Sequence, residues 1–156
     1  MKRRFKNGPL VPPGNYTARL TAHDQVLEQS FEIIMDPRIL DEGITKDDVI
    51  EQLEFQNKVI ALLSEVRLFE SKLSKEQDKL KGKKSKNKIA KFNDIQVLLK
   101  QLNNEKGAYP QQMLISQISY LLNMVSRADQ LPGKDATDRL VELENEWKNI
   151  YSSYSK

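Results

Sequence analysis

Asp and Glu side chains are the first candidates for acid–base chemistry in this 156-residue chain, and their spacing indicates whether any two could act together. Hydrolysis of a sugar linkage, for example, needs two carboxyl groups on opposite sides of one cleft. Glu142 and Glu146 are four residues apart, which places them on one face of a helix. Such pairs are common on solvated helix faces, so the sequence predicts a solvated face and no catalytic pair. The other carboxylates that we expect on solvated helix faces are Glu51, Glu54, Glu65, Glu70 and Glu144.

The remaining reactive residue types form no pattern that catalysis or metal binding requires. His23 is the single histidine, at a predicted turn, and the chain has no cysteine. Gly82-Lys83-Lys84-Ser85 is similar to part of a phosphate-binding loop, but the first glycine and the preceding strand of that motif are missing. We therefore predict no catalytic, cofactor-binding or metal-binding residues, and no cofactor.

Three aromatic residues near the C-terminus have the residue types of a ligand-binding platform: Trp147, Tyr151 and Tyr154. Trp147 and Tyr154 also continue the apolar stripe of a predicted helix, and core packing is the favoured interpretation for both. Tyr151 lies off that stripe and is the member that we expect to be exposed.

The net charge of +3 is unevenly distributed along the chain. Between Lys72 and Lys91 there are nine lysines against Glu76 and Asp78. One interpretation is binding to nucleic acid or to another acidic surface. The other is a solvated connection between two helices, which is how charge runs usually behave. Because the lysines are not interleaved with arginines or aromatics, we expect a flexible connection over residues 81–88 and no nucleic-acid partner.

Four segments carry apolar residues at the three- and four-residue spacing of amphipathic helices. The first has Thr45 as its predicted cap, with Asp48 favouring the helix N-terminus, and runs past Lys79. Its stripe is Phe55, Val59, Leu62, Val66, Phe69, Leu73 and Leu80, widened by Val49, Leu53, Ile60 and Leu63 as in a helix that is buried in a bundle.

The three later helices are predicted from shorter stripes. The second carries Ile89, Phe92, Ile95, Leu99 and Leu102. The third starts at Pro110, which suits a first helical turn, and carries Leu114, Ile118, Leu121, Val125 and Ala128. The fourth carries Ala136, Leu140, Leu143, Trp147, Ile150 and Tyr154. Four such helices with short connections predict an antiparallel bundle.

The N-terminal part of the chain has the two-residue periodicity of strands instead. Tyr16–Leu20 and Leu27–Ile33 alternate apolar with polar residues, and His23-Asp24-Gln25 is the predicted turn. Asp36-Pro37 ends the second strand. The fold class is therefore mainly α with a small β element, an N-terminal antiparallel β-hairpin followed by an antiparallel bundle of about four helices. We divide the chain into 1–38, a hairpin remnant of a β-sandwich-like domain, and 39–156, the helical bundle.

The predicted hairpin needs a partner because two strands alone are marginally stable. Its apolar face should either cover the bundle or add edge-to-edge to the same hairpin of a second chain. The second outcome predicts a homodimer or a higher oligomer. The predicted interaction surface is Tyr16, Leu27, Phe31, Ile33 and Tyr151.

The composition, with 38% apolar and 30% charged residues, fits helices with one buried face. The chain has no stretch of 18 apolar residues, so no membrane span is expected. Met1-Lys2-Arg3-Arg4 is a basic start, but no apolar run follows it, and no signal peptide is predicted.

Two passages are similar to a known protein family. Gly8 to Arg38 resembles a "GP-x-VPPG-x-Y-x-x-RLT … DPR" passage near the C-terminus of large secreted bacterial β-propeller proteins with sortilin-type or BNR-type repeats, often labelled glycosyl hydrolases. Tyr109 to Pro132 resembles the helical end of the same proteins. This chain has no Asp-box repeats and no propeller blades, so the resemblance implies a C-terminal fragment or a truncated relative.

The resemblance leaves three functional hypotheses. The first is a non-catalytic structural or interaction module at the C-terminus of a propeller-containing extracellular protein, located outside the cell or in the cell envelope, with the parent propeller domain or another protein as its partner. The second is a free-standing helical binding protein that dimerises or grips a partner through its helix hairpin. The third, a glycoside hydrolase, is disfavoured because its activity would belong to the absent propeller.

Overall fold

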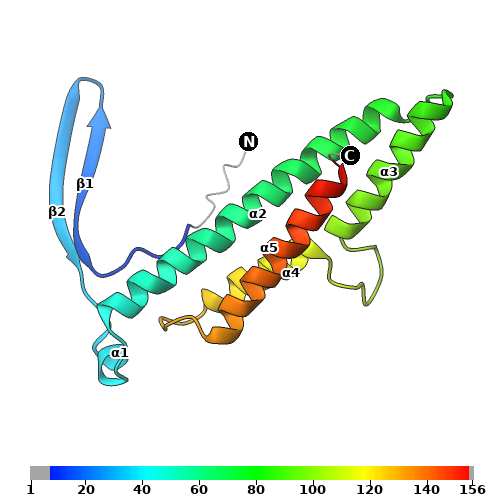
Figure 1. Cartoon of the computed structure of the whole chain (residues 1–156). Coiled ribbons are helices and arrows are strands. Elements are labelled where there is room, and N and C mark those ends of the chain that lie inside the picture. The colour runs from blue at the N-terminus through cyan, green and yellow to red at the C-terminus, as the bar shows by residue number, and fades with distance from the viewer. Residues whose placement is uncertain (1–7, 155–156) are drawn as a thin grey trace.

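The structure, a computed structural model, describes residues 8–154, so the basic start of the chain lies outside the described residues. A two-stranded antiparallel sheet comes first and five helices follow it (Figure 1). The strands are β1 (Gly14–Ala22) and β2 (Gln25–Ile33), and the helices are α1 (Pro37–Asp41), α2 (Lys46–Leu80), α3 (Lys86–Leu102), α4 (Leu114–Val125) and α5 (Lys134–Tyr154).

The predicted fold class is confirmed, since helices make up 61% of the structure and the sheet consists of the hairpin alone. The four long helices form an elongated bundle around α2 (Figure 1). Helices α3 and α4 follow one another along α2, and both pack on it. Helix α5 packs chiefly against α4 and closes the bundle.

Two hydrogen bonds fix the direction of α5. Near the middle of α2, Glu65 Oε1 accepts a hydrogen bond from Trp147 Nε1 at 3.1 Å. Farther along α2, Glu76 Oε2 accepts one from Tyr154 Oη at 3.0 Å. Residue numbers rise together in the two helices, so α5 runs parallel to α2.

Helix α3 runs the opposite way. Lys91, near its start, forms an ion pair with Glu76 at 2.5 Å. Asn103, just past its end, donates to Glu70 at 3.3 Å, one helical turn or more earlier in α2. The chain therefore reverses at the tip between α2 and α3, and returns once more through α5 (Figure 1).

The core is apolar and contains side chains from all four long helices. Val59, Val66 and Leu73 of α2 are completely buried and lie seven residues apart, two turns of one helix face. The other buried apolar residues are Phe55, Leu62, Leu63, Phe69, Ile95, Leu98, Leu102, Leu114, Ile118, Leu121, Val125, Ala136, Leu140, Leu143, Trp147 and Ile150. Every one of them lies between residues 55 and 150, so the bundle has its own core without the hairpin.

Helix α2 begins after Thr45, as the sequence predicted, and a further short helix, α1, precedes it. Thr45 caps α2, and the Asp48 carboxylate accepts a hydrogen bond from the Thr45 backbone amide at 2.8 Å, which completes a capping box. The short helix α1 was not predicted. Asp36 is its N-cap and Pro37 its first residue, so the Asp-Pro pair that was predicted to end the second strand begins a helix, and β2 itself ends earlier, at Ile33.

Two predicted boundaries in the second half of the chain were wrong. Helix α4 begins at Leu114 and not at Pro110: its N-cap Met113 has an extended backbone, and the Met113 amide donates to Asn104 Oδ1 at 2.8 Å. Helix α3 begins at Lys86, so the connection between α2 and α3 is 81–85 and the last residues of the expected flexible segment are helical.

The hairpin is longer than predicted and stands away from the bundle (Figure 1). Gln25 pairs with Ala22 and belongs to β2, which leaves His23 and Asp24 as a two-residue turn. His23 has a φ of 53°, as the first position of such tight turns requires. Neither strand comes within 8 Å (Cα to Cα) of a helix, so the hairpin does not cover the bundle.

Truncation of the core should destabilise the bundle in proportion to burial. Leu62→Ala or Leu121→Ala, at positions that are 7% and 2% exposed, should each lower the free energy of unfolding by roughly 2–5 kcal/mol. Leu68→Ala is the matched control on α2, because Leu68 is 74% exposed and its loss should cost about 0.5 kcal/mol or less. Urea denaturation measures all three, and equal effects at positions 62 and 68 would contradict the core assignment.

Candidate interaction site

The hairpin has one apolar and one polar face. On the apolar face the rings of Tyr16 and Phe31 pair across the strands with their centroids 6.0 Å apart, and Leu20 pairs with Leu27. Leu20 is 62% exposed, Leu27 64% and Phe31 46%. Large apolar side chains on one face, uncovered over most of its length, form an exposed hydrophobic patch.

The opposite face is polar and suited to water. Arg19 Nε donates to Glu28 Oε1 at 2.5 Å across the strands, and Thr17 pairs with Ser30 in the neighbouring position. The alternation that the sequence predicted is therefore present in the register of the strands, because directly paired residues point to the same face.

Both outer edges of the hairpin are open and carry no bulge, proline or lysine, and the charges of Arg19, Glu28 and Glu32 lie on its polar face. The register from Gly14↔Ile33 to Ala22↔Gln25 is continuous, without a bulge. No proline and no lysine occurs between Gly14 and Ile33. Proline, lysine and bulges are the common means of blocking strand addition. The hairpin therefore offers unprotected backbone donors and acceptors on each side, next to an uncovered apolar face.

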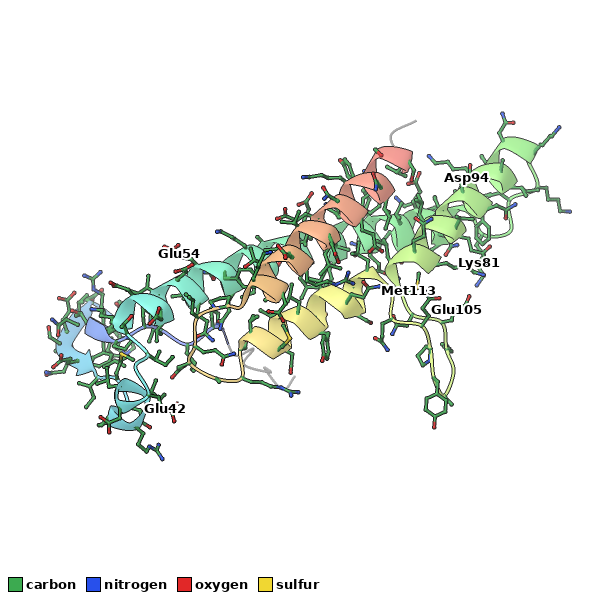
Figure 2. The ribbon with its side chains drawn as sticks, turned by 60° about the horizontal axis from the view of Figure 1, so that its bottom comes forward. Glu42, Glu54, Lys81, Asp94, Glu105 and Met113 are labelled. Atoms are coloured by element: carbon green, nitrogen blue, oxygen red, sulfur yellow. The ribbon has the colours of Figure 1, made fainter. Side chains whose placement is uncertain are left out.

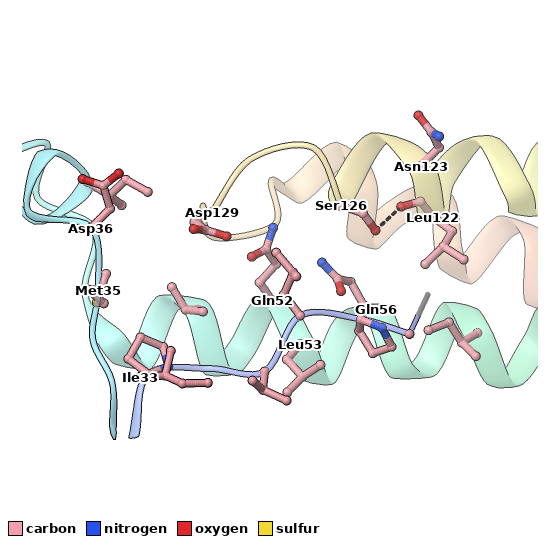
Figure 3. Close-up of a pocket in the computed structure, with 18 of the residues that line it drawn as sticks. Ile33, Met35, Asp36, Gln52, Leu53, Gln56, Leu122, Asn123, Ser126 and Asp129 are labelled. Carbon is pink, nitrogen blue, oxygen red and sulfur yellow. Dashed lines mark hydrogen bonds between the residues drawn. The ribbon is translucent and has the colours of Figure 1, made fainter. Parts of the chain in front are cut away.

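The base of the hairpin is anchored where it meets the bundle. Tyr16 Oη donates to the Pro12 carbonyl at 2.6 Å, which ties β1 to the segment before it. Ile33, at the end of β2, is half-buried and lines a groove of about 720 Å³. This groove lies between the N-terminal half of α2, helix α4, the segment 8–13 and the link 34–39 (Figure 3). The sequence analysis did not predict it.

The groove is apolar on the α2 side, with Leu53 and Ile60 half-buried in its wall. Two buried glutamines, Gln52 and Gln56, also line it (Figure 3). Gln52 Nε2 donates to the carbonyls of Val125 at 2.7 Å and of Ala128 at 2.5 Å. Gln56 Nε2 donates to Val125 at 3.1 Å. These bonds satisfy the Val125 carbonyl, which the last turn of α4 leaves without an intrahelical partner, and the Ala128 carbonyl in the loop that follows.

Asp36 lies at the rim of the groove near the base of the hairpin (Figure 3). Hydrogen bonds from the Arg38 side chain and backbone lower the pKa of the Asp36 carboxyl to about 2. The group is therefore ionised at neutral pH and acts as the cap of α1, not as a proton donor.

Tyr151 does not join the hairpin surface. It lies near the end of α5, with its ring centroid 5.3 Å from those of Phe69 and Trp147. Trp147 is only 5% exposed and Tyr154 packs against the core, as the sequence predicted, so neither can form an open platform. Tyr151 itself is 49% exposed and covers the edge of this aromatic cluster.

The other groups that were considered for chemistry are scattered. Glu142 is exposed and pairs with Arg139 at 2.6 Å. His23 lies at the tip of the hairpin turn, and Gly82 lies in the exposed connection between α2 and α3. Within residues 8–154 no cluster of three or more His, Cys, Asp or Glu is placed to hold a metal ion. None of the described helices combines the length and hydropathy that crossing a bilayer requires.

Comparison of the chain with protein-family models, curated proteins and solved structures finds no match in any of the three. The resemblance to the C-terminal region of propeller proteins therefore stays a prediction.

Removal of the Gln52 amide should loosen the junction between α2 and α4. Gln52→Met keeps the side-chain volume but leaves the Ala128 carbonyl without its donor, which should cost roughly 1–3 kcal/mol in the free energy of unfolding. Gln101→Met on the exposed side of α3 is the control and should change it little. Chemical denaturation of both variants measures the difference. If Gln52→Met leaves the free energy of unfolding unchanged, the Gln52 hydrogen bonds do not stabilise the junction between α2 and α4.

Proposed function

We propose that this chain is a non-catalytic interaction module whose N-terminal hairpin docks on a β-strand-bearing partner. The observation that carries the proposal is the combination of an uncovered apolar face with two unprotected strand edges. Strand addition uses the free backbone groups for affinity and the alternate side chains for specificity. Burial of Leu20, Leu27 and Phe31 against the partner would supply the hydrophobic contribution.

The setting that we propose is the C-terminal end of a propeller-containing protein outside the cell or in the cell envelope. This part of the proposal is supported by the resemblance of Gly8–Arg38 and Tyr109–Pro132 to such proteins. The partner would then be the parent β-domain, or the same hairpin of a second copy. The bundle, whose core excludes the hairpin, would act as a stable support that holds the hairpin in position.

The oligomeric state of the isolated chain tests the proposal. With no other strand available, the full chain should form a dimer or a higher oligomer at high micromolar concentration, because its hairpin edges can pair only with another copy. A version that starts at Asp41 retains the whole core and should be monomeric. Sedimentation velocity over a concentration series measures both. If the full chain is also monomeric, strand-mediated self-association is excluded.

Two point variants that add the same charge distinguish the contribution of the apolar face to association from that of the rest of the hairpin. Leu27→Lys places a charge in the centre of the apolar face and should abolish association. Ser30→Lys places the same charge on the opposite face with Thr17; it adds the same obstacle to strand addition at that edge but leaves the apolar face intact, so it should weaken association less. Equal loss with both variants would assign the effect to net charge and contradict docking through the apolar face.

A further inference from the structure

The helical hairpin made by α2 and α3 ends in a strongly basic tip. Past the hydrogen bond between Tyr154 and Glu76, α2 and α3 are the only described elements that continue (Figure 1). We define the lysine tip as residues 77–90. It contains the lysines 79, 81, 83, 84, 86 and 88 against one acid, Asp78, so its net charge is 6 − 1 = +5.

The tip carries more positive charge than the whole chain. The net charge of the chain is +3, so the remaining residues together carry 3 − 5 = −2. The acidic groups include Glu42 and Glu54 toward the hairpin end of the molecule, whereas Lys81 lies toward the other end, where Asp94 of α3 is also found (Figure 2). The molecule is therefore electrostatically polar along its long axis.

These lysines have no structural role in the fold. Residues 81–91 are all exposed, and none of the six tip lysines has an ion-pair partner among the described residues. At the base of the tip, Glu76 is already neutralised by Lys91, which lowers the pKa of the Glu76 carboxyl, so this acid does not offset the tip. Six like charges on a small surface repel one another, and the fold gains nothing in return.

We propose that the lysine tip binds an anionic membrane surface and attaches the molecule to it end-on. The lysines lie on both helices and on the turn that joins them, so they surround a convex end. Because the six charges lie within ten residues around this one end, an extended anionic surface that faces the tip attracts all of them, over a Debye length of about 10 Å at 0.1 M salt. The tip has no arginine or aromatic side chain for phosphate forks or base stacking, which favours a membrane surface over nucleic acid as its partner.

Two further features support this orientation. Ile89, which follows Lys88 in the first turn of α3, is 46% exposed and can enter the interfacial region of a bilayer. The negative remainder of the molecule is repelled by the same surface, which steers the tip toward it. Helix α2 is about 50 Å long, so the hairpin is held far from the membrane. The proposal does not depend on the function proposed for the hairpin.

Vesicle co-sedimentation of the full chain tests the proposal. The chain should bind phosphatidylcholine vesicles that contain about 30% phosphatidylglycerol, and not vesicles of phosphatidylcholine alone. Binding should disappear near 1 M NaCl, where the Debye length falls to about 3 Å. The variant Lys81→Gln/Lys83→Gln/Lys84→Gln/Lys88→Gln should bind at least about 100-fold more weakly, since each lysine near such a surface changes the partition constant about fivefold.

The matched control removes four lysines away from the tip and has the same net charge: Lys46→Gln/Lys58→Gln/Lys106→Gln/Lys148→Gln. It should bind within about threefold of the unmodified chain, and both variants should keep its melting temperature, because all eight side chains are exposed. Three results would overturn the proposal: equal losses in the two variants, equal binding to neutral vesicles, or no binding to anionic vesicles at low salt. Tighter binding of duplex DNA than of vesicles would assign the tip to nucleic acid, and self-association lost in the tip variant would assign it to a second copy.

Discussion

Helix α2 buries one continuous face along most of its 35 residues, and the other long helices meet through that face. Its backbone hydrogen bonds alone would not hold so long a helix, because helix stability in proteins comes mainly from tertiary packing of an apolar face. Val59, Val66 and Leu73 repeat every two turns and are completely buried, so the buried face is apolar through the middle of the helix, with Gln52 and Gln56 as its polar members toward the N-terminal end. Helices α3 and α4 are placed in sequence along it, and α5 closes over α4.

Polar bonds at the edges of this core select one arrangement from those that apolar stripes alone would permit. Trp147 and Tyr154 of α5 reach carboxylates on α2, and Gln52 reaches the carbonyls at the end of α4. Apolar contacts are non-directional. A buried amide or indole that loses its partner is costly, so these groups set the axial position of each helix on α2.

The length of α2 also separates the two surfaces for which we propose binding roles. The hairpin is joined to its N-terminal end through α1, and the lysine tip follows its C-terminal end, about 50 Å away. The two surfaces differ in chemistry as well as in place. One offers apolar side chains and backbone hydrogen-bonding groups, and the other offers only charge. A molecule of this form could hold a β-rich partner at a fixed distance from an anionic surface.

The sequence by itself determined what depends on near neighbours in the chain. The capping box at Thr45, the buried stripes and the alternation of the hairpin were all predictable, because capping and periodicity are local. The tertiary structure decided the rest. The start of α4 depends on Asn104, nine residues before Met113, and Tyr151 lies far from the hairpin because α5 runs parallel to α2. Leu53 and Ile60 were predicted to widen a buried stripe, yet they line an open groove, because which side of a helix is covered depends on where its neighbours pack and not on its own pattern.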